Sequence, residues 1–155
     1  MHTPFQPSEQ VWATLEAMNE ASHRGQPFFF ILDFELQEGV FVLEPLQHHD
    51  GSLFFAFPTA KTPDPIGTKD TLTLTPSPEA PERYDERFDI IHRGLMRGDS
   101  FLTNLTIRTP IETEASLADI YLSSEATYRV LLPRRFVSFS PECFVKLQGD
   151  ELATH

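Results

Sequence analysis

The 155-residue sequence contains a single cysteine, Cys143, so the chain cannot form an internal disulfide bond. A shortage of cysteine fits a reducing compartment. No apolar run approaches the ~20 residues that a transmembrane helix needs, and the N-terminus lacks the basic and apolar pattern of a secretion signal. Together these absences predict a cytoplasmic protein that does not enter a membrane.

Basic residues are also scarce. The chain has 12 Lys and Arg against 23 Asp and Glu, which gives a formal net charge of −11. We therefore expect neither nucleic acid nor an anionic membrane as a partner, because no basic patch offsets the repulsion. A small anionic substrate is not excluded, since a few cations can reverse the field in one cleft. Apolar residues, in contrast, make up 40% of the chain and include 14 Phe, so a folded core is expected.

Hydrophobic periodicity predicts helices at 8–24, 82–97 and near 115–124. In the second, an apolar stripe runs through Tyr84, Phe88, Ile91 and Leu95, and Gly98 ends the helix. Strands are predicted at 28–34, 40–46, 52–57, 71–75, 100–109, 127–132, 136–140 and 143–148, with another beginning at 151. The continuous apolar run at 28–34 predicts burial on both faces. Because strands dominate and do not alternate with helices, the expected class is α+β, with largely antiparallel sheets and helices packed outside.

Two short motifs carry competing interpretations. His48-His49-Asp50 could supply metal ligands, but adjacent residues of a strand point to opposite faces, and Asp50-Gly51 favours a polar hairpin turn. In the predicted strand 100–109, one face is mostly apolar and the other, which contains Asn104, is mostly polar. That polar face either meets solvent or forms the floor of a substrate site.

Glu142 is the sharpest candidate for chemistry. It lies in FVSFSPECFVKL (136–147), where Ser140-Pro141-Glu142 separates two apolar strands. Apolar neighbours disfavour the charged form of a carboxyl group and raise its pKa, which would make Glu142 a usable general acid near neutral pH. The alternative is a turn residue that points at water. Taken alone, Ser-Pro-Glu is a common turn.

Two blocks together resemble the chorismate-binding enzymes, most closely component I of aminodeoxychorismate (para-aminobenzoate) synthase. The first is GDSFLTNL at 98–105 and the second is SFSPECF at 138–144. The resemblance covers about residues 82–155, the start of a chorismate-binding core, whereas residues 1–75 fit a variable N-terminal sheet region more loosely. It implies a single domain across 1–155 that holds about half of the family fold, two orthogonal antiparallel sheets with chorismate bound between them.

The resemblance implies an amine transfer, in which ammonia replaces the C4 hydroxyl of chorismate to give 4-amino-4-deoxychorismate for folate synthesis. Glu142 would then be the general acid that protonates the departing hydroxyl, and Asn104 and Ser140 would contact the substrate. A glutamine amidotransferase subunit would supply the ammonia. Leu102 occupies the position where water-adding relatives carry a basic lysine, so an isochorismate product is disfavoured. Amine-transferring relatives usually have glutamine there, so Leu102 departs from both patterns.

The resemblance also implies that other parts of the site lie beyond His155. These are the Pro-Ile-Lys-Gly-Thr motif with its nucleophilic lysine and the glutamates that hold Mg²⁺; we assign no metal ligand within the 155 residues. We therefore expect this chain to be inactive alone. Two alternatives stay open: component I of anthranilate synthase, and a non-catalytic binding module or gene remnant.

Overall fold

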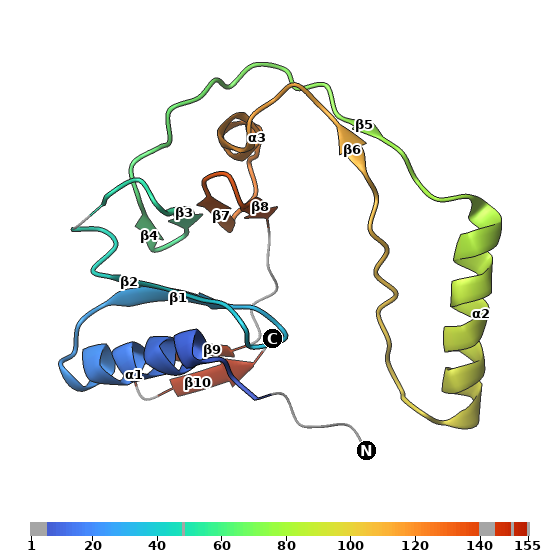
Figure 1. Cartoon of the computed structure of the whole chain (residues 1–155), viewed down its shortest axis with the longest axis horizontal. Helices are drawn as coiled ribbons and strands as arrows, with labels where there is room; N and C mark the ends of the chain where they lie inside the picture. The colour runs from blue at the N-terminus through green and yellow to red at the C-terminus, as the bar shows by residue number, and fades with distance from the viewer. Residues whose placement is uncertain (1–5, 48, 140–144, 150, 155) are drawn as a thin grey trace. The chain divides into compact units, whose positions relative to one another are not determined.

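A computed structural model describes residues 6–47, 49–139, 145–149 and 151–154 (Figure 1). The chain divides into two compact units, one made of residues 1–69 and 116–155 and the other of residues 70–115. Every strand pairing among the described residues is antiparallel. The α+β class and the antiparallel sheets are therefore confirmed. No helix in the described part of the chain is long and apolar enough to cross a membrane.

The first unit has four layers. Helix α1 (Glu9–His23) lies on the hairpin of β1 (Phe28–Leu32) and β2 (Gly39–Leu43). The other face of this hairpin packs against a four-stranded sheet with the strand order β4-β3-β7-β8. The sheet comprises β3 (Phe54–Phe57), β4 (Ala60–Lys61), β7 (Arg129–Leu132) and β8 (Phe136–Phe139). Helix α3 (Leu117–Ser123) covers the far side of that sheet, so both helices lie outside, as expected.

Local signals explain the helix of the first layer. The Ser8 hydroxyl accepts a hydrogen bond from the Val11 N–H and so satisfies one of the free donors of the first turn of α1. The helix ends before Gly25, which has a φ of +65°. Close packing on β2 requires glycine at 39, because a Cβ atom there would lie 2.5 Å from the Thr14 hydroxyl.

Strand β7 is the centre of the unit because it buries both of its faces. Val130 and Leu132 join Leu53 and Phe55 in the cluster beneath the β1–β2 hairpin. Leu131 points the other way, into a cluster with Tyr121 and Leu122 of α3. Each cluster therefore depends on alternate residues of the same strand.

Two expectations in the first unit are wrong. Strand β1 is only half-buried, since α1 covers its outer face incompletely and leaves Phe30 46% exposed. Residues 49–51 also do not close a hairpin, because β2 and β3 belong to different sheets. Turn residues predict a reversal of the chain but not the sheet that it enters.

The second unit contains helix α2 (Pro81–Arg97) and a short pairing of β5 (Thr75–Pro76) with β6 (Ile111–Glu112). The helix confirms the prediction for 82–97, and Gly98 ends it with a φ of +83°. Of the strand predicted at 71–75, only Thr75 lies in a strand, as the first residue of β5. The strand predicted at 100–109 is wrong, because these residues have no regular secondary structure.

A final hairpin confirms the strands predicted after residue 143. It pairs β9 (Val145–Gln148) with β10 (Glu151–Thr154), and Gly149 in the turn has a φ of +61°. The exposed side chains of Leu147 and Leu152 come from these two strands.

We expect the stability of the first unit to depend on pH through Asp119. Its carboxylate accepts hydrogen bonds from the Ser116 hydroxyl at 2.6 Å and the Thr68 N–H at 2.7 Å. Led by the Ser116 hydroxyl, these bonds lower the pKa of Asp119 from 3.8 to about 2. Its stabilising contribution is therefore present above pH 3.8 and is lost as the pH falls from there through about 2.

Urea unfolding at pH 5, 4, 3 and 2 would test this. Asp119→Asn should be less stable than the wild type at pH 5, and the difference should shrink as the pH falls. Asp85→Asn, in which an exposed carboxylate without a described partner is removed, should show no such trend. A stability difference for Asp119→Asn that stays constant over this pH range would contradict the assignment.

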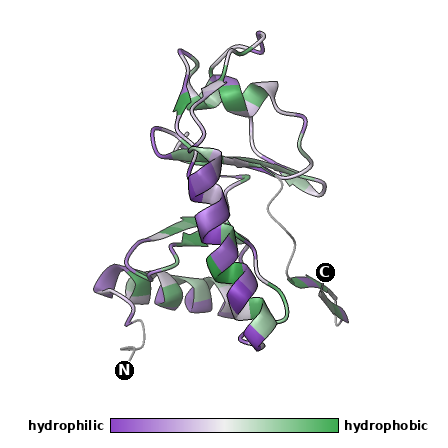
Figure 2. Cartoon of the chain, turned by 90° about the vertical axis from the view of Figure 1, so that its right-hand side faces the viewer, coloured by the Kyte–Doolittle hydropathy of each residue, from purple (hydrophilic) through white to green (hydrophobic). Residues whose placement is uncertain are grey.

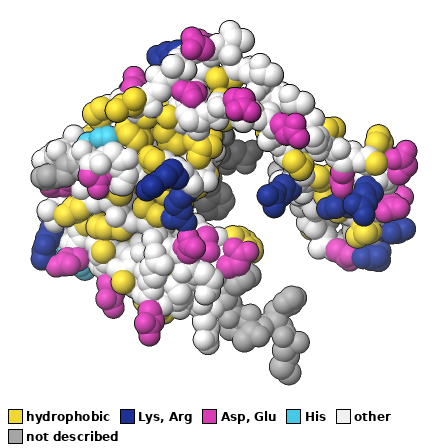
Figure 3. All heavy atoms as spheres, turned by 45° about the horizontal axis from the view of Figure 1, so that its top comes forward, with side chains coloured by type: hydrophobic (Ala, Val, Ile, Leu, Met, Phe, Trp, Pro, Cys, Tyr) yellow, Lys and Arg dark blue, Asp and Glu magenta, His cyan; other side chains and the backbone are white. Residues whose placement is uncertain are grey.

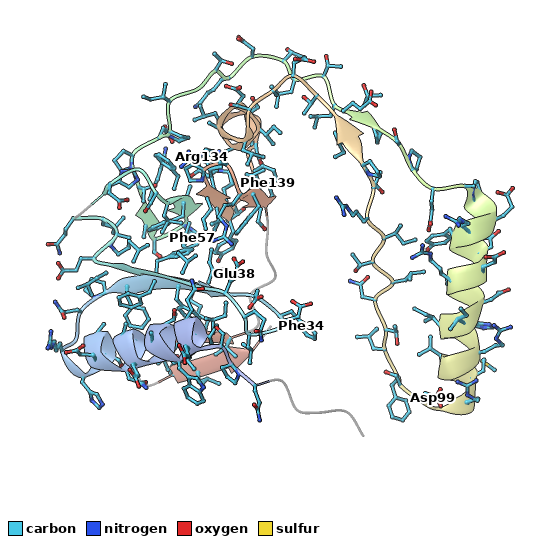
Figure 4. The ribbon with its side chains drawn as sticks, viewed as in Figure 1. Phe34, Glu38, Phe57, Asp99, Arg134 and Phe139 are labelled. Carbon is cyan, nitrogen blue, oxygen red and sulfur yellow. The ribbon has the colours of Figure 1, made fainter. Side chains whose placement is uncertain are left out.

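The turn between β7 and β8 stores backbone strain at Arg134, labelled in Figure 4. Arg134 has a φ of +63°, and the following Arg135 N–H donates to the Leu132 carbonyl at 3.0 Å. A left-handed backbone conformation destabilises a folded non-glycine residue by about 1–2 kcal/mol. Glycine avoids this strain, but its greater freedom in the unfolded chain lowers the stability by about 0.5–1 kcal/mol. Arg134→Gly should therefore stabilise the protein by about 0.5 kcal/mol. Urea unfolding should show this gain and none for Arg134→Ala, which keeps the strain; equal stabilities of the two variants would contradict it.

Candidate active site

The β7–β8 hairpin leads the chain to the Ser-Pro-Glu motif. Strand β8 is an edge strand of the four-stranded sheet, and its last residue, Phe139, pairs with Arg129 of β7. Residues 140–144 follow directly. The predicted catalytic residue Glu142 and the predicted substrate contact Ser140 both lie outside the described residues, so their roles stay predictions.

Arg129 is a residue that the sequence prediction missed. Its guanidinium donates to the backbone carbonyls of Tyr121 and Ser124, and it stacks over the Tyr121 ring at 5.2 Å from the ring centre. Arg129 Nε and the Tyr121 hydroxyl oxygen are both buried without a hydrogen-bond partner among the described residues. The pair thus carries unused hydrogen-bonding capacity beside the strand that leads to 140–144.

The Tyr121 hydroxyl is a neutral donor in this cluster. Burial raises the pKa of Tyr121 above its ordinary value of 10.0; the Arg129 guanidinium partly opposes this shift and Asp64 adds to it. The hydroxyl therefore stays protonated at neutral pH. One signal in the sequence could have identified the cluster: Arg129 is the one charged residue of YRVLL (128–132), an otherwise apolar strand.

Asn104, the predicted substrate contact of the first block, lies in the second unit. Its side chain is exposed and makes no hydrogen bond among the described residues. The strand that was expected to present it does not form, because no described strand pairs with 101–109. Asn104 belongs to the second unit, whereas the residues of the second block belong to the first.

Described residues of the first unit line two cavities. One, of about 470 Å³, lies between the start of α3 and the β7–β8 turn. Its lining includes Phe54, Ile66, Leu131 and Arg134. The other, of about 260 Å³, is lined by phenylalanines of β1 and β3 and by the segment 44–47 that follows β2. Neither includes Asn104 or Arg129. Neither of these two cavities therefore corresponds to the predicted substrate site, as far as its residues are described.

The described residues contain no cluster of three or more His, Cys, Asp or Glu side chains that could hold a metal ion. His48 lies outside the described residues. Its neighbours behave as turn residues: His49 Nε2 lies 2.8 Å from the Leu53 carbonyl oxygen, and Asp50 accepts the Ser52 N–H at 2.8 Å.

Comparisons with known proteins place these features in a family. The family model described as chorismate binding enzyme matches residues 43–155, which include both sequence blocks. An uncharacterised PabA-like protein of Pasteurella multocida (strain Pm70) is 32% identical over 153 residues, which covers 92% of this chain and 44% of that protein. An uncharacterised PabA-like protein of Haemophilus influenzae is 31% identical over 146 residues, which covers 89% of this chain and 43% of that protein.

The chain thus spans less than half the length of these two relatives. No solved structure matches it. The family match extends over most of the 155 residues, from the end of β2 through the Ser-Pro-Glu segment. The chain therefore belongs to the family of chorismate binding enzymes.

Proposed function

We propose that this chain forms part of an amine-transferring chorismate enzyme that makes 4-amino-4-deoxychorismate. The observation that carries the proposal is the family match over residues 43–155, because it includes Asn104, Ser140 and Glu142. The relatives named PabA-like agree with this branch of the family. Leu102 adds a chemical reason, since its side chain has no basic atom that could activate water for an isochorismate reaction.

In the proposed reaction, the C4–O bond of chorismate breaks and a C4–N bond forms with ammonia. Glu142 transfers its proton to the departing hydroxyl, which leaves as water, and the ammonium group formed at C4 then returns a proton to the Glu142 carboxylate. Proton transfer matters because hydroxide is a poor leaving group. Asn104 and Ser140 hold the substrate while this occurs. A glutamine amidotransferase subunit is the proposed source of ammonia.

We further propose that activity requires the part of the family domain that the relatives contain and these 155 residues do not match. The basis is the length comparison, since each relative is more than twice as long as the segment it shares with this chain. The first sequence block fits this proposal, because Asn104 lies on a segment that pairs with no strand among the described residues.

The test uses a chimaera that joins the 155 residues to the unmatched part of the Pasteurella relative. We expect it to consume chorismate only when an ammonium salt is present, with Mg²⁺ added to all reactions. The 155-residue chain alone should leave chorismate unchanged. Consumption of chorismate without ammonium would contradict amine transfer, and turnover by the 155-residue chain alone would contradict the need for the remaining part.

A further inference from the structure

Helix α2 presents an apolar face that no other described residue of the second unit buries. At 3.6 residues per turn, the side chains of Tyr84, Phe88, Ile91 and Leu95 fall within an arc of about 60°. We call these four residues the α2 stripe. No residue of α2 is buried, and Tyr84 and Phe88 are 44% and 49% exposed. Figure 2 shows hydrophilic and hydrophobic residues along the helix.

Most of the remaining helix surface is charged, although Ile90 and Met96 are also exposed there, at 62% and 76%. Its eight charged residues are Glu82, Arg83, Asp85, Glu86, Arg87, Asp89, Arg93 and Arg97, and Figure 3 shows acidic and basic side chains mixed with hydrophobic ones in the space-filling view. Four acids and four arginines balance, so the helix has no net charge to recruit an ionic partner. A helix whose contiguous apolar stripe is flanked by charged residues is suited to packing against an apolar surface.

A second, independent feature follows α2 directly. The side chains of Phe101 and Leu102 are 103% and 88% exposed. The backbone N–H and C=O groups of residues 103–109 make no hydrogen bond within the described structure. This is the segment whose alternating side chains predict a strand. Backbone groups of a strand require partners when they leave water, so the segment has the sequence of a strand without its neighbour.

We propose that the α2 stripe and the backbone of 101–109 form one docking surface for the part of the family domain that the longer relatives contain and this chain does not match. The proposal rests on the proposed function. The partner places a strand beside 101–109 and an apolar surface over the stripe. Formation of that strand fixes Asn104, which converts an exposed side chain into a substrate contact.

The size of the relatives favours this occupant. More than half of each relative has no counterpart here, although both match about nine-tenths of this chain. A second copy of the chain is a poorer candidate, because it brings another net charge of −11 toward a chain of the same charge.

Direct binding tests the proposal. The unmatched part of the Pasteurella relative is produced as a separate protein, mixed with the full 155-residue chain, and the dissociation constant is measured by calorimetry without chorismate. Phe88→Ser should weaken binding about 10–100-fold, the effect expected for losing one buried aromatic side chain. Asp89→Ser, on the charged face of the same helix, should change it less than about twofold. Circular dichroism checks that both variants keep their helix content.

Hydrogen exchange gives a second readout that does not require the partner to fold alone. In the chimaera, the amides of 103–109 should exchange at least about 10-fold more slowly than in the 155-residue chain. Equal exchange in the two proteins, or equal affinity of Phe88→Ser and the wild type, would overturn the proposal. A dimer of the 155-residue chain that Phe88→Ser dissociates would instead assign the stripe to a second copy. If the separate protein binds but the chimaera does not turn over chorismate, the proposed function is contradicted and the docking surface is not.

Discussion

Glu142→Gln should reduce the turnover of chorismate by the chimaera at least ~100-fold, the size of effect typical for loss of a general acid. Glutamine keeps the shape of the side chain and can still donate a hydrogen bond, but it cannot release a proton to the leaving hydroxyl. The Michaelis constant should change less than about threefold, because the interaction that is lost exists only in the transition state. Steady-state kinetics at saturating ammonium measures both constants.

The control for this prediction is Glu151→Gln, which removes a carboxylate from the exposed start of β10. It should retain nearly full activity. The pH profile adds a second criterion. The turnover of the wild type should fall as the pH rises through the pKa of the acid, and Glu142→Gln should lose that dependence. If Glu142→Gln retains a turnover rate within about fivefold of the wild type, Glu142 is not the general acid.

Leu131→Ala should destabilise the first unit by about 2–5 kcal/mol. Leu131 is 1% exposed and lies between α3 and the four-stranded sheet, in contact with the cluster of Tyr121 and Leu122. Its removal leaves a cavity that α3 and the sheet cannot close, because β7 is pinned between β3 and β8 on either side. Urea unfolding followed by the fluorescence of Trp12, the sole tryptophan, measures the loss.

Leu147→Ala makes the same chemical change in β9, where the side chain is 68% exposed. It should cost less than about 0.5 kcal/mol, since little apolar surface leaves water when Leu147 folds. Similar losses for the two variants would mean that β7 does not form the shared centre of the two hydrophobic clusters.

The sequence predicts those elements whose signals are local. Helix α1 is set by the Ser8 cap and Gly25, and α2 by its apolar stripe and Gly98. Strands β7 and β8 fall within the two short apolar runs predicted as strands at 127–132 and 136–140. In each case residues close in the sequence determine the structure, so the sequence pattern is sufficient to predict the element.

The errors arise where distant residues decide. The alternation of 100–109 is real, but a strand forms only when another strand supplies hydrogen bonds, and none described does so. Phe30 is apolar within an apolar run, yet its exposure depends on how far α1 extends over the hairpin. For the site, the sequence singles out Glu142 by a motif, whereas Arg129 and Tyr121 meet only because α3 packs on β7.

The central claim is that ammonia replaces the C4 hydroxyl of chorismate on this protein, and the identity of the product tests it most directly. The chimaera is incubated with chorismate and an ammonium salt, and the product is separated and identified by mass spectrometry. The expected product is 4-amino-4-deoxychorismate, which retains the enolpyruvyl group and carries nitrogen in place of the hydroxyl oxygen. Anthranilate would contradict it and assign the protein to the other amine-transferring branch, and unchanged chorismate in a folded chimaera would contradict catalysis altogether.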